Sequence, residues 1–128
     1  MPLASYATLY QALLNGAVEV KFARRRKLPG LPPIRRMLCS NCSALLGSTN
    51  GRIVLNYKQP THGIKYDPAA KGLIITWDIL MQDYRNISLD ACEIIKTYEP
   101  TDEFWQMFNE TYYPMSQQQK ILFMAAVS

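Results

Sequence analysis

Short segments in which apolar residues alternate with polar ones constrain the fold of this chain more than any other feature. In the clearest of them, Val18, Val20 and Phe22 alternate with charged residues. A two-residue period puts successive side chains on opposite faces of an extended chain, so residues 17–23 are predicted to form a half-buried strand.

Further strands are predicted on the same grounds. They cover residues 34–40, 52–57, 73–80, 84–87 and 91–98. Turn residues at 48–51 and at 81–83 separate several of them. The turn at 81–83 is expected to place Asp78 opposite Arg85 across a hairpin.

Helices are predicted at both ends of the chain. Residues 5–15 carry an apolar stripe, with Ser5 as N-cap and Gly16 at the C′ position. Residues 41–46 are expected to form one helical turn. Thr101 is expected to cap a helix that ends at residues 112–114, and Ser116 begins a capping box for a last helix over residues 117–127.

These elements predict a mainly β fold with helical ends. The expected form is a small SH3-like or Sm-like β-barrel of about five strands, with an N-terminal helix and two C-terminal helices. The alternative is an open α+β sheet backed by the helices. The 128 residues are enough for one domain, divided into an N-terminal helix (1–16), a β core (17–99) and a helical C-terminal extension (100–128).

The charges are distributed unevenly along the chain. Residues 1–66 contain ten Lys and Arg and one acidic residue, a net charge of +9, whereas residues 67–128 contain four basic and nine acidic residues, a net charge of −5. The basic half predicts an anionic partner. The alternative is that the two halves pair with each other inside the protein.

A basic loop is the strongest candidate binding site. It lies between the first two predicted strands, is rich in proline, and would become a basic finger if the two strands pair. The predicted nucleic-acid-binding residues are Lys21, Arg24, Arg25, Arg26, Lys27, Arg35 and Arg36. Such a cluster can neutralise several phosphates of DNA or RNA, and Tyr57, Tyr66 and Tyr84 would offer stacking surfaces.

The alternative function is a protein-interaction module that binds and modulates a host protein of the transcription or defence machinery. The C-terminal helices are rich in aromatic residues, which are enriched at interfaces, and the basic finger can equally bind an acidic protein surface. The predicted interaction residues are Phe104, Trp105, Phe108, Tyr112 and Tyr113. A homo-oligomer is also compatible with this surface.

No pattern in the sequence indicates catalysis. The chain has one histidine and none of the common nucleophile, zinc-protease or phosphate-loop motifs, so a non-enzymatic protein without a cofactor is expected. The only metal candidate is a weak zinc set of Cys39, Cys42, His62 and Cys92. The alternative is that the cysteines are ordinary buried thiols that bind no metal.

The sequence contains four short motifs, Val18-x-Val20-x-Phe22, Arg35-x-Met37-x-Cys39, Trp77-Asp78 and Tyr84-Arg85-x-Ile87. Together they resemble a family of small phage-encoded proteins that is described as having an Sm-like or SH3-like β-barrel fold and is related in name to WYL domains. The resemblance covers about residues 17–96. It implies the barrel and a phage or bacterial setting, with nucleic-acid or regulatory binding by analogy. The proline-rich insertion after Arg26 and the helical tail after Pro100 depart from the family's pattern.

The expected location is the cytoplasm, of a bacterial host if the protein is phage-encoded. The apolar stretches are too short to cross a membrane, and residues 1–16 lack the pattern of a signal peptide. Three cysteines without framework spacing favour a reducing compartment.

Overall fold

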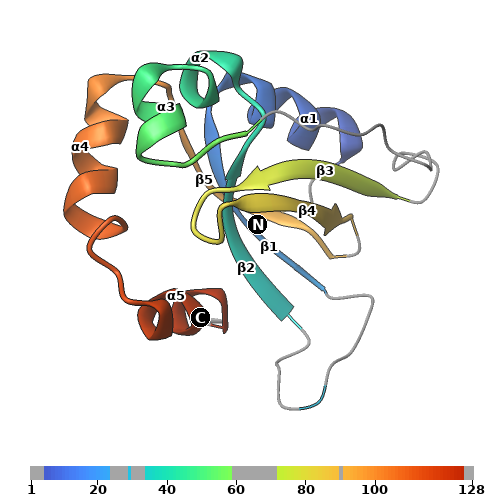
Figure 1. The fold of residues 1–128 in the computed structure, drawn as a ribbon. Helices are drawn as coiled ribbons and strands as arrows, with labels where there is room; N and C mark the ends of the chain where they lie inside the picture. Colours follow the sequence, from blue (N-terminus) through green and yellow to red (C-terminus); the bar gives the residue numbers. More distant parts are fainter. Residues whose placement is uncertain (1–4, 24–28, 30–33, 59–71, 90, 126–128) are drawn as a thin grey trace.

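The computed structural model describes residues 5–23, 29, 34–58, 72–89 and 91–125. Five antiparallel strands form one sheet (Figure 1). The strands are β1 (Ala17–Ala23), β2 (Ile34–Ser40), β3 (Leu73–Asp78), β4 (Asp83–Ser88) and β5 (Glu93–Tyr98). Their order in the sheet is β4-β3-β2-β1-β5, so β4 and β5 are its two edges.

Among the described residues, five helices accompany the sheet, near the chain ends and between β2 and β3. They are α1 (Tyr6–Asn15), α2 (Ser43–Leu46), α3 (Thr49–Ile53), α4 (Asp102–Thr111) and α5 (Gln117–Ala125). The Ser5 hydroxyl accepts a hydrogen bond from the Thr8 amide, which confirms the predicted N-cap of α1. Ser116 and Gln119 form the predicted capping box, each side chain accepting from the other's backbone amide.

The two faces of the sheet bury separate apolar clusters. One cluster joins Leu9 and Leu13 of α1 to Val18, Val20 and Phe22 of β1. The other joins side chains of α2, α4 and α5 to Leu38 and Trp77. The alternation predicted for β1 and β2 is therefore confirmed, since neighbouring residues of each strand contribute to different clusters. The expected half-burial of β1 is wrong, because both of its faces are covered and even Glu19 is buried.

Gly16 connects α1 to β1 at a place where the backbones come very close. Its φ of 170° is extended, so it does not adopt the left-handed conformation that is common for a C′ glycine. A Cβ atom there would collide with the carbonyl oxygen of Tyr98 in β5. The glycine is required because it lets the start of β1 lie against the end of β5.

One predicted strand is wrong. Residues 52–57 do not form a strand. Their first two residues belong to the short helix α3, which Ser48 caps by accepting a hydrogen bond from the Gly51 amide. Helix α3 also packs closely on α2, since a Cβ at Gly51 would collide with the carbonyl oxygens of Leu45 and Leu46. The alternation of Ile53, Leu55 and Tyr57 therefore does not reflect a strand.

The predicted pair of Asp78 and Arg85 is also wrong. Asp78 lies opposite Asp83, and Arg85 lies opposite Thr76. The turn between β3 and β4, in which Gln82 has a φ of 57°, is centred one residue earlier in the sequence than a pairing of Asp78 with Arg85 would require. Asp78 binds an arginine on a different strand instead.

The fold class is confirmed as a five-stranded antiparallel sheet with helices at both ends, as the open α+β alternative predicted. Among the described residues, no pairing joins the edge strands β4 and β5 into a closed barrel.

Candidate anion-binding hairpin

Strands β1 and β2 form a hairpin whose connection contains the predicted basic loop. The two strands pair without interruption from Ala17 and Ser40 to Ala23 and Ile34. The connecting end of this hairpin lies at the opposite end of the molecule from α2 and α3 (Figure 1). Residues 24–33, here called the tip, begin directly after the last pair; Arg24, Arg25, Arg26 and Lys27 lie outside the described residues.

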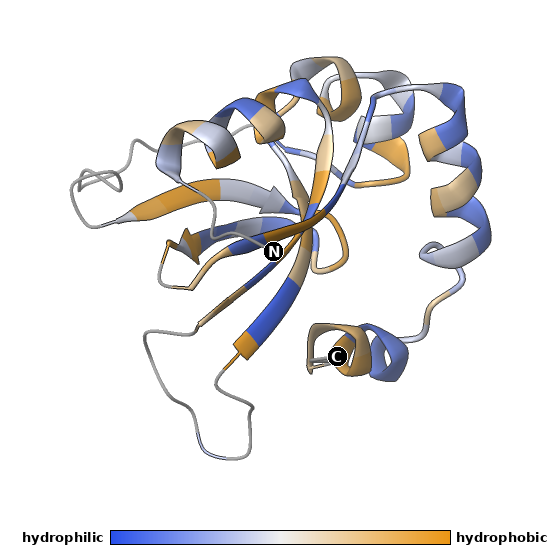
Figure 2. Ribbon diagram, turned by 180° about the vertical axis from the view of Figure 1, so that it is seen from behind, coloured by the Kyte–Doolittle hydropathy of each residue, from blue (hydrophilic) through white to orange (hydrophobic). Residues whose placement is uncertain are grey.

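The paired part of the hairpin, here called the stem, carries the three other predicted residues. Figure 2 shows a hydrophilic stretch of β2 next to the tip, where Arg35 and Arg36 lie. Lys21 lies directly opposite Arg36 in the register. Two cations in facing positions repel each other, so the stem needs acidic side chains nearby.

Arg35 is bound by Asp78 of β3. An Nη atom of Arg35 donates to an Oδ atom of Asp78 at 2.6 Å, and the two side chains are only 12% and 2% exposed. The second Oδ atom accepts from the Met81 amide. Burial raises the pKa of Asp78, and the Arg35 guanidinium opposes that rise. The pair fixes β2 to the end of β3.

Arg36 is bound on the other side of the strand by Glu19 of β1. The guanidinium Nε donates to a carboxylate oxygen at 2.8 Å, and the Glu19 side chain is 5% exposed. The guanidinium carbon also lies 4.1 Å from the ring centroid of Phe123, so α5 covers this pair through a cation–π contact. Met124 of the same helix contacts Arg35 through its sulfur.

Lys21 makes the weakest of the three ion pairs. Its ammonium lies 3.8 Å from a carboxylate oxygen of Glu93, its partner in the register with β5. The three cations of the stem are therefore each opposed by an acid on a neighbouring strand.

The tyrosines predicted to stack on bases are used in packing where the structure describes them. Tyr57 and Tyr84 both contact the ring of Trp77, and the Tyr84 hydroxyl donates to that of Tyr57 at 2.8 Å. Burial is the main cause of a raised pKa at Tyr84. Tyr66 lies outside the described residues.

The weak zinc set is not assembled in the described part of the chain. Cys39 and Cys42 are buried in different apolar clusters, and His62 lies outside the described residues. No group of three potential ligands occurs among the residues searched. Burial raises the pKa of Cys39, and it raises that of Cys92 to about 11, so both thiols keep their protons at neutral pH.

The aromatic residues of the alternative interface lie mostly inside the protein. Phe104, Phe108 and Tyr112 are buried and Trp105 is half-buried, whereas Tyr113 is 64% exposed. Phe108 lies between the rings of Phe104 and Tyr112, each with its centroid 6.0 Å away. Of this set, only Tyr113 offers a whole side chain to a partner.

Sequence reasoning missed the acids that hold the stem. The alternation in β1 predicts only that Glu19 lies on its polar face, and the predicted hairpin pairs Asp78 with Arg85. The available signal was the position of both acids within strongly apolar strands, since a carboxylate there requires a partner.

No protein-family model, curated protein or solved structure matches this chain. Within the described segments, none of the helices combines the length and apolar character that crossing a bilayer requires.

Proposed function

We propose that this protein binds nucleic acid through the tip of the β1–β2 hairpin. The observation that carries the proposal is the uninterrupted pairing of β1 with β2 up to Ala23 and Ile34. Four consecutive cations, Arg24 to Lys27, follow directly on that pairing. The basic loop therefore connects two paired strands, which is the arrangement that the predicted basic finger requires.

The stem acts as a support and not as a binding surface. Lys21, Arg35 and Arg36 are opposed by acids within the protein. Phosphates therefore bind chiefly to the tip, where arginine can fork to phosphate oxygens and stack on bases. Of the seven residues predicted to bind nucleic acid, the proposal therefore keeps the four of the tip, Arg24, Arg25, Arg26 and Lys27.

The sheet is proposed to be part of an SH3-like or Sm-like barrel, as the family resemblance implies. Two observations support this. The last strand returns to pair with the first, with a bulge between Glu19 and Val20, and the non-adjacent strands β1 and β4 contact each other, so the sheet is strongly curled. The phage setting and the regulatory role stay predictions.

The proposal is tested by fluorescence anisotropy of labelled single- and double-stranded DNA and RNA over a range of salt concentrations. Four phosphate contacts give a slope of log affinity against log salt of about −3 to −4. The double variant Arg24→Gln/Arg25→Gln should reduce the magnitude of that slope by about 2. Replacing all four tip cations should abolish binding.

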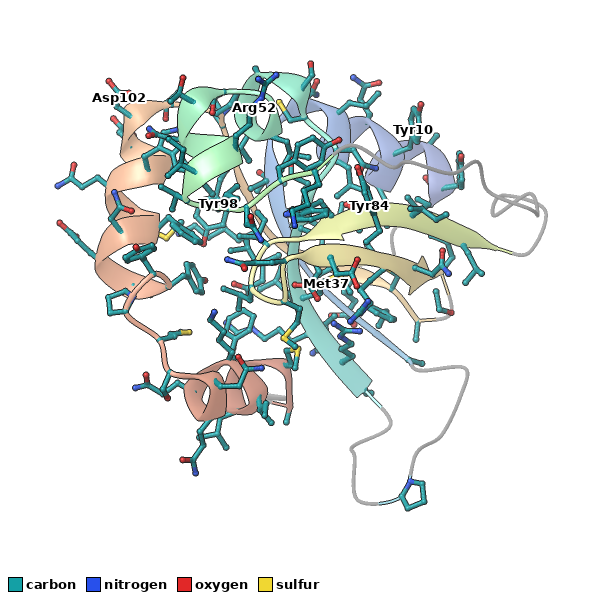
Figure 3. All side chains as sticks on the ribbon, viewed as in Figure 1. Tyr10, Met37, Arg52, Tyr84, Tyr98 and Asp102 are labelled. Atoms are coloured by element: carbon teal, nitrogen blue, oxygen red, sulfur yellow. The ribbon has the colours of Figure 1, made fainter. Side chains whose placement is uncertain are left out.

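A matched control removes the same charge elsewhere. Arg52 and Lys58 are exposed, and Arg52 lies on α3, outside the β1–β2 hairpin (Figure 3). Arg52→Gln/Lys58→Gln should leave the slope nearly unchanged. If the two double variants weaken binding equally, the overall charge and not the tip binds the polymer, and the proposal fails.

A further inference from the structure

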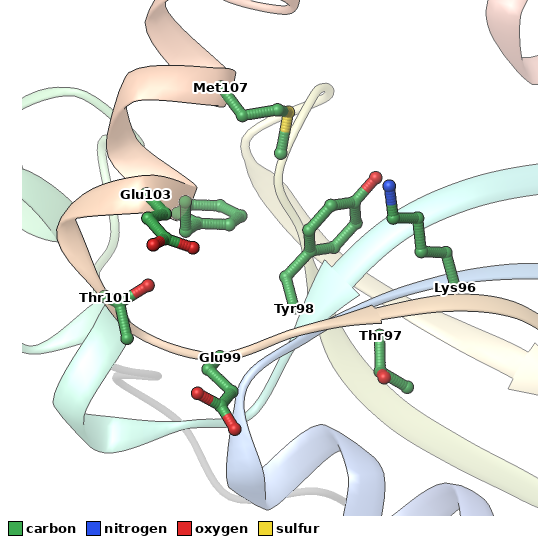
Figure 4. Close-up of a pocket in the computed structure, with 8 residues that line it drawn as sticks. Lys96, Thr97, Tyr98, Glu99, Thr101, Glu103 and Met107 are labelled. Atoms are coloured by element: carbon green, nitrogen blue, oxygen red, sulfur yellow. The ribbon is translucent and has the colours of Figure 1, made fainter.

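A cavity lies between the end of β5 and the first turns of α4 (Figure 4). Its volume is about 410 Å³. Its main lining side chains are Lys96, Tyr98, Glu99, Glu103, Phe104 and Met107. The rings of Tyr98 and Phe104 meet edge to face at 5.9 Å, and Phe104 is buried, so one wall of the cavity is the apolar core itself.

The cavity continues an open edge of the sheet. Strand β5 pairs with β1 on one side, and no described strand pairs with its other side. Successive residues 96–99 of this edge line the cavity. The outer edge of a strand presents backbone N–H and C=O groups in a row, which can pair with a further extended chain.

The charges around the cavity favour a cationic ligand. Of the side chains that line the cavity, Glu99 and Glu103 are exposed acids and Lys96 is the one cation, a net charge of −1 for the lining. Neither Glu99 nor Glu103 forms an ion pair with a described residue. The Lys96 ammonium lies 5.1 Å from the Tyr98 ring centroid, so a cation already occupies one aromatic face of the site.

We propose that the β5 edge and this cavity bind an extended basic peptide segment of a partner protein. The peptide backbone pairs with β5 as an additional strand, and one Arg or Lys side chain enters the cavity. The alkyl part of that side chain packs on Phe104 and Met107, while its charge lies beside Glu99 and Glu103. This site is separate from the hairpin tip and does not depend on the proposed function.

The test uses a labelled hexapeptide of alternating Thr and Val with one central Arg, and a matched peptide with Glu in its place. The Arg peptide should bind the full-length protein at least tenfold more tightly than the Glu peptide. Glu99→Lys/Glu103→Lys should reverse this preference. N-methylation of alternate peptide amides should abolish binding, because it removes the hydrogen bonds of an added strand.

The control is Glu110→Lys, which changes the charge of α4 at an exposed position that does not line the cavity. It should keep the preference for the Arg peptide, and circular dichroism should show all variants folded. Equal binding of both peptides, or no binding of either at millimolar concentration, overturns the proposal.

Two further measurements separate this site from its competitors. Replacing the four tip cations should leave peptide binding unchanged, whereas loss of it would place the peptide at the hairpin instead. If sedimentation shows self-association that Glu99→Lys/Glu103→Lys removes, the occupant is a second copy of this chain, and the partner-protein proposal is wrong.

Discussion

The hairpin stem and the β5–α4 cavity both gather charged side chains, but they use them in opposite ways. In the stem, Arg35 and Arg36 are bound by buried acids on neighbouring strands. At the cavity, Glu99 and Glu103 are exposed beside the rings of Tyr98 and Phe104. Neither forms an ion pair with a described residue. The first arrangement stabilises the fold, and the second leaves charge for a ligand.

The difference shows that a cluster of charges in the sequence does not by itself mark a binding site. Buried charges must be paired with one another, because an isolated charge away from water is very costly. Exposed charges are subject to no such requirement, so they are the ones available to a partner. Substitutions of charged residues in the two regions test this distinction, and the pH dependence of stability tests the burial of Cys92 beside them.

The largest effect is expected for Asp78→Ala. It leaves Arg35 buried without its carboxylate, which should lower the free energy of unfolding by about 3–5 kcal/mol in urea denaturation. Glu103→Ala at the cavity should change it by less than about 0.5 kcal/mol. The double variant Arg35→Met/Asp78→Leu should recover most of the loss. If Asp78→Ala lowers the free energy of unfolding by less than about 1 kcal/mol, the stem pair does not stabilise the fold more than the cavity charges do.

A smaller loss is expected for Glu19→Ala. Its carboxylate accepts a hydrogen bond from Arg36 within the stem, and hydrogen bonds to charged groups contribute about 1.5–3 kcal/mol. The same denaturation measurement applies. Glu99→Ala is the control at the cavity, and similar losses for both variants would show that the two regions do not differ.

Alkaline pH should destabilise the protein through Cys92, at the start of β5. Its pKa is raised to about 11 by burial and then by Glu93, so the unfolded chain loses this proton first. Stability should therefore fall between about pH 9 and pH 11, by about 1–2 kcal/mol relative to Cys92→Ala. If the free energy of unfolding depends on pH in the same way in the wild type and in Cys92→Ala, the Cys92 thiol is not buried as the prediction requires.

The smallest effect is expected for Lys21→Ala. The Lys21–Glu93 pair is long and partly exposed, with side chains 24% and 28% exposed. Such pairs contribute little, so the free energy of unfolding should fall by less than about 0.5 kcal/mol. A loss comparable to that of Glu19→Ala would mean that all three stem pairs act as one network.

The sequence by itself determined most of the strands and the side-chain caps at Ser5 and Ser116. Thr101 occupies the predicted N-cap position of α4, but its side chain makes no capping hydrogen bond. The bounds of β1 and β2 follow from a two-residue alternation, which is a local property of the chain. The caps at Ser5 and Ser116 are local as well, since each joins residues three positions apart. The strand predicted at residues 52–57 is the exception. It is wrong because the cap at Ser48 and the packing of Gly51 on α2 favour a helix over the strand that the apolar alternation indicates.

Only the tertiary structure decided which charges are available. Arg35 and Asp78 are 43 residues apart, and Arg36 and Glu19 are 17 apart, so no local pattern connects them. The cavity likewise depends on how α4 packs against β5. Alternation specifies which face of a strand a side chain occupies, but the strand order of the sheet specifies which opposite charge it meets there.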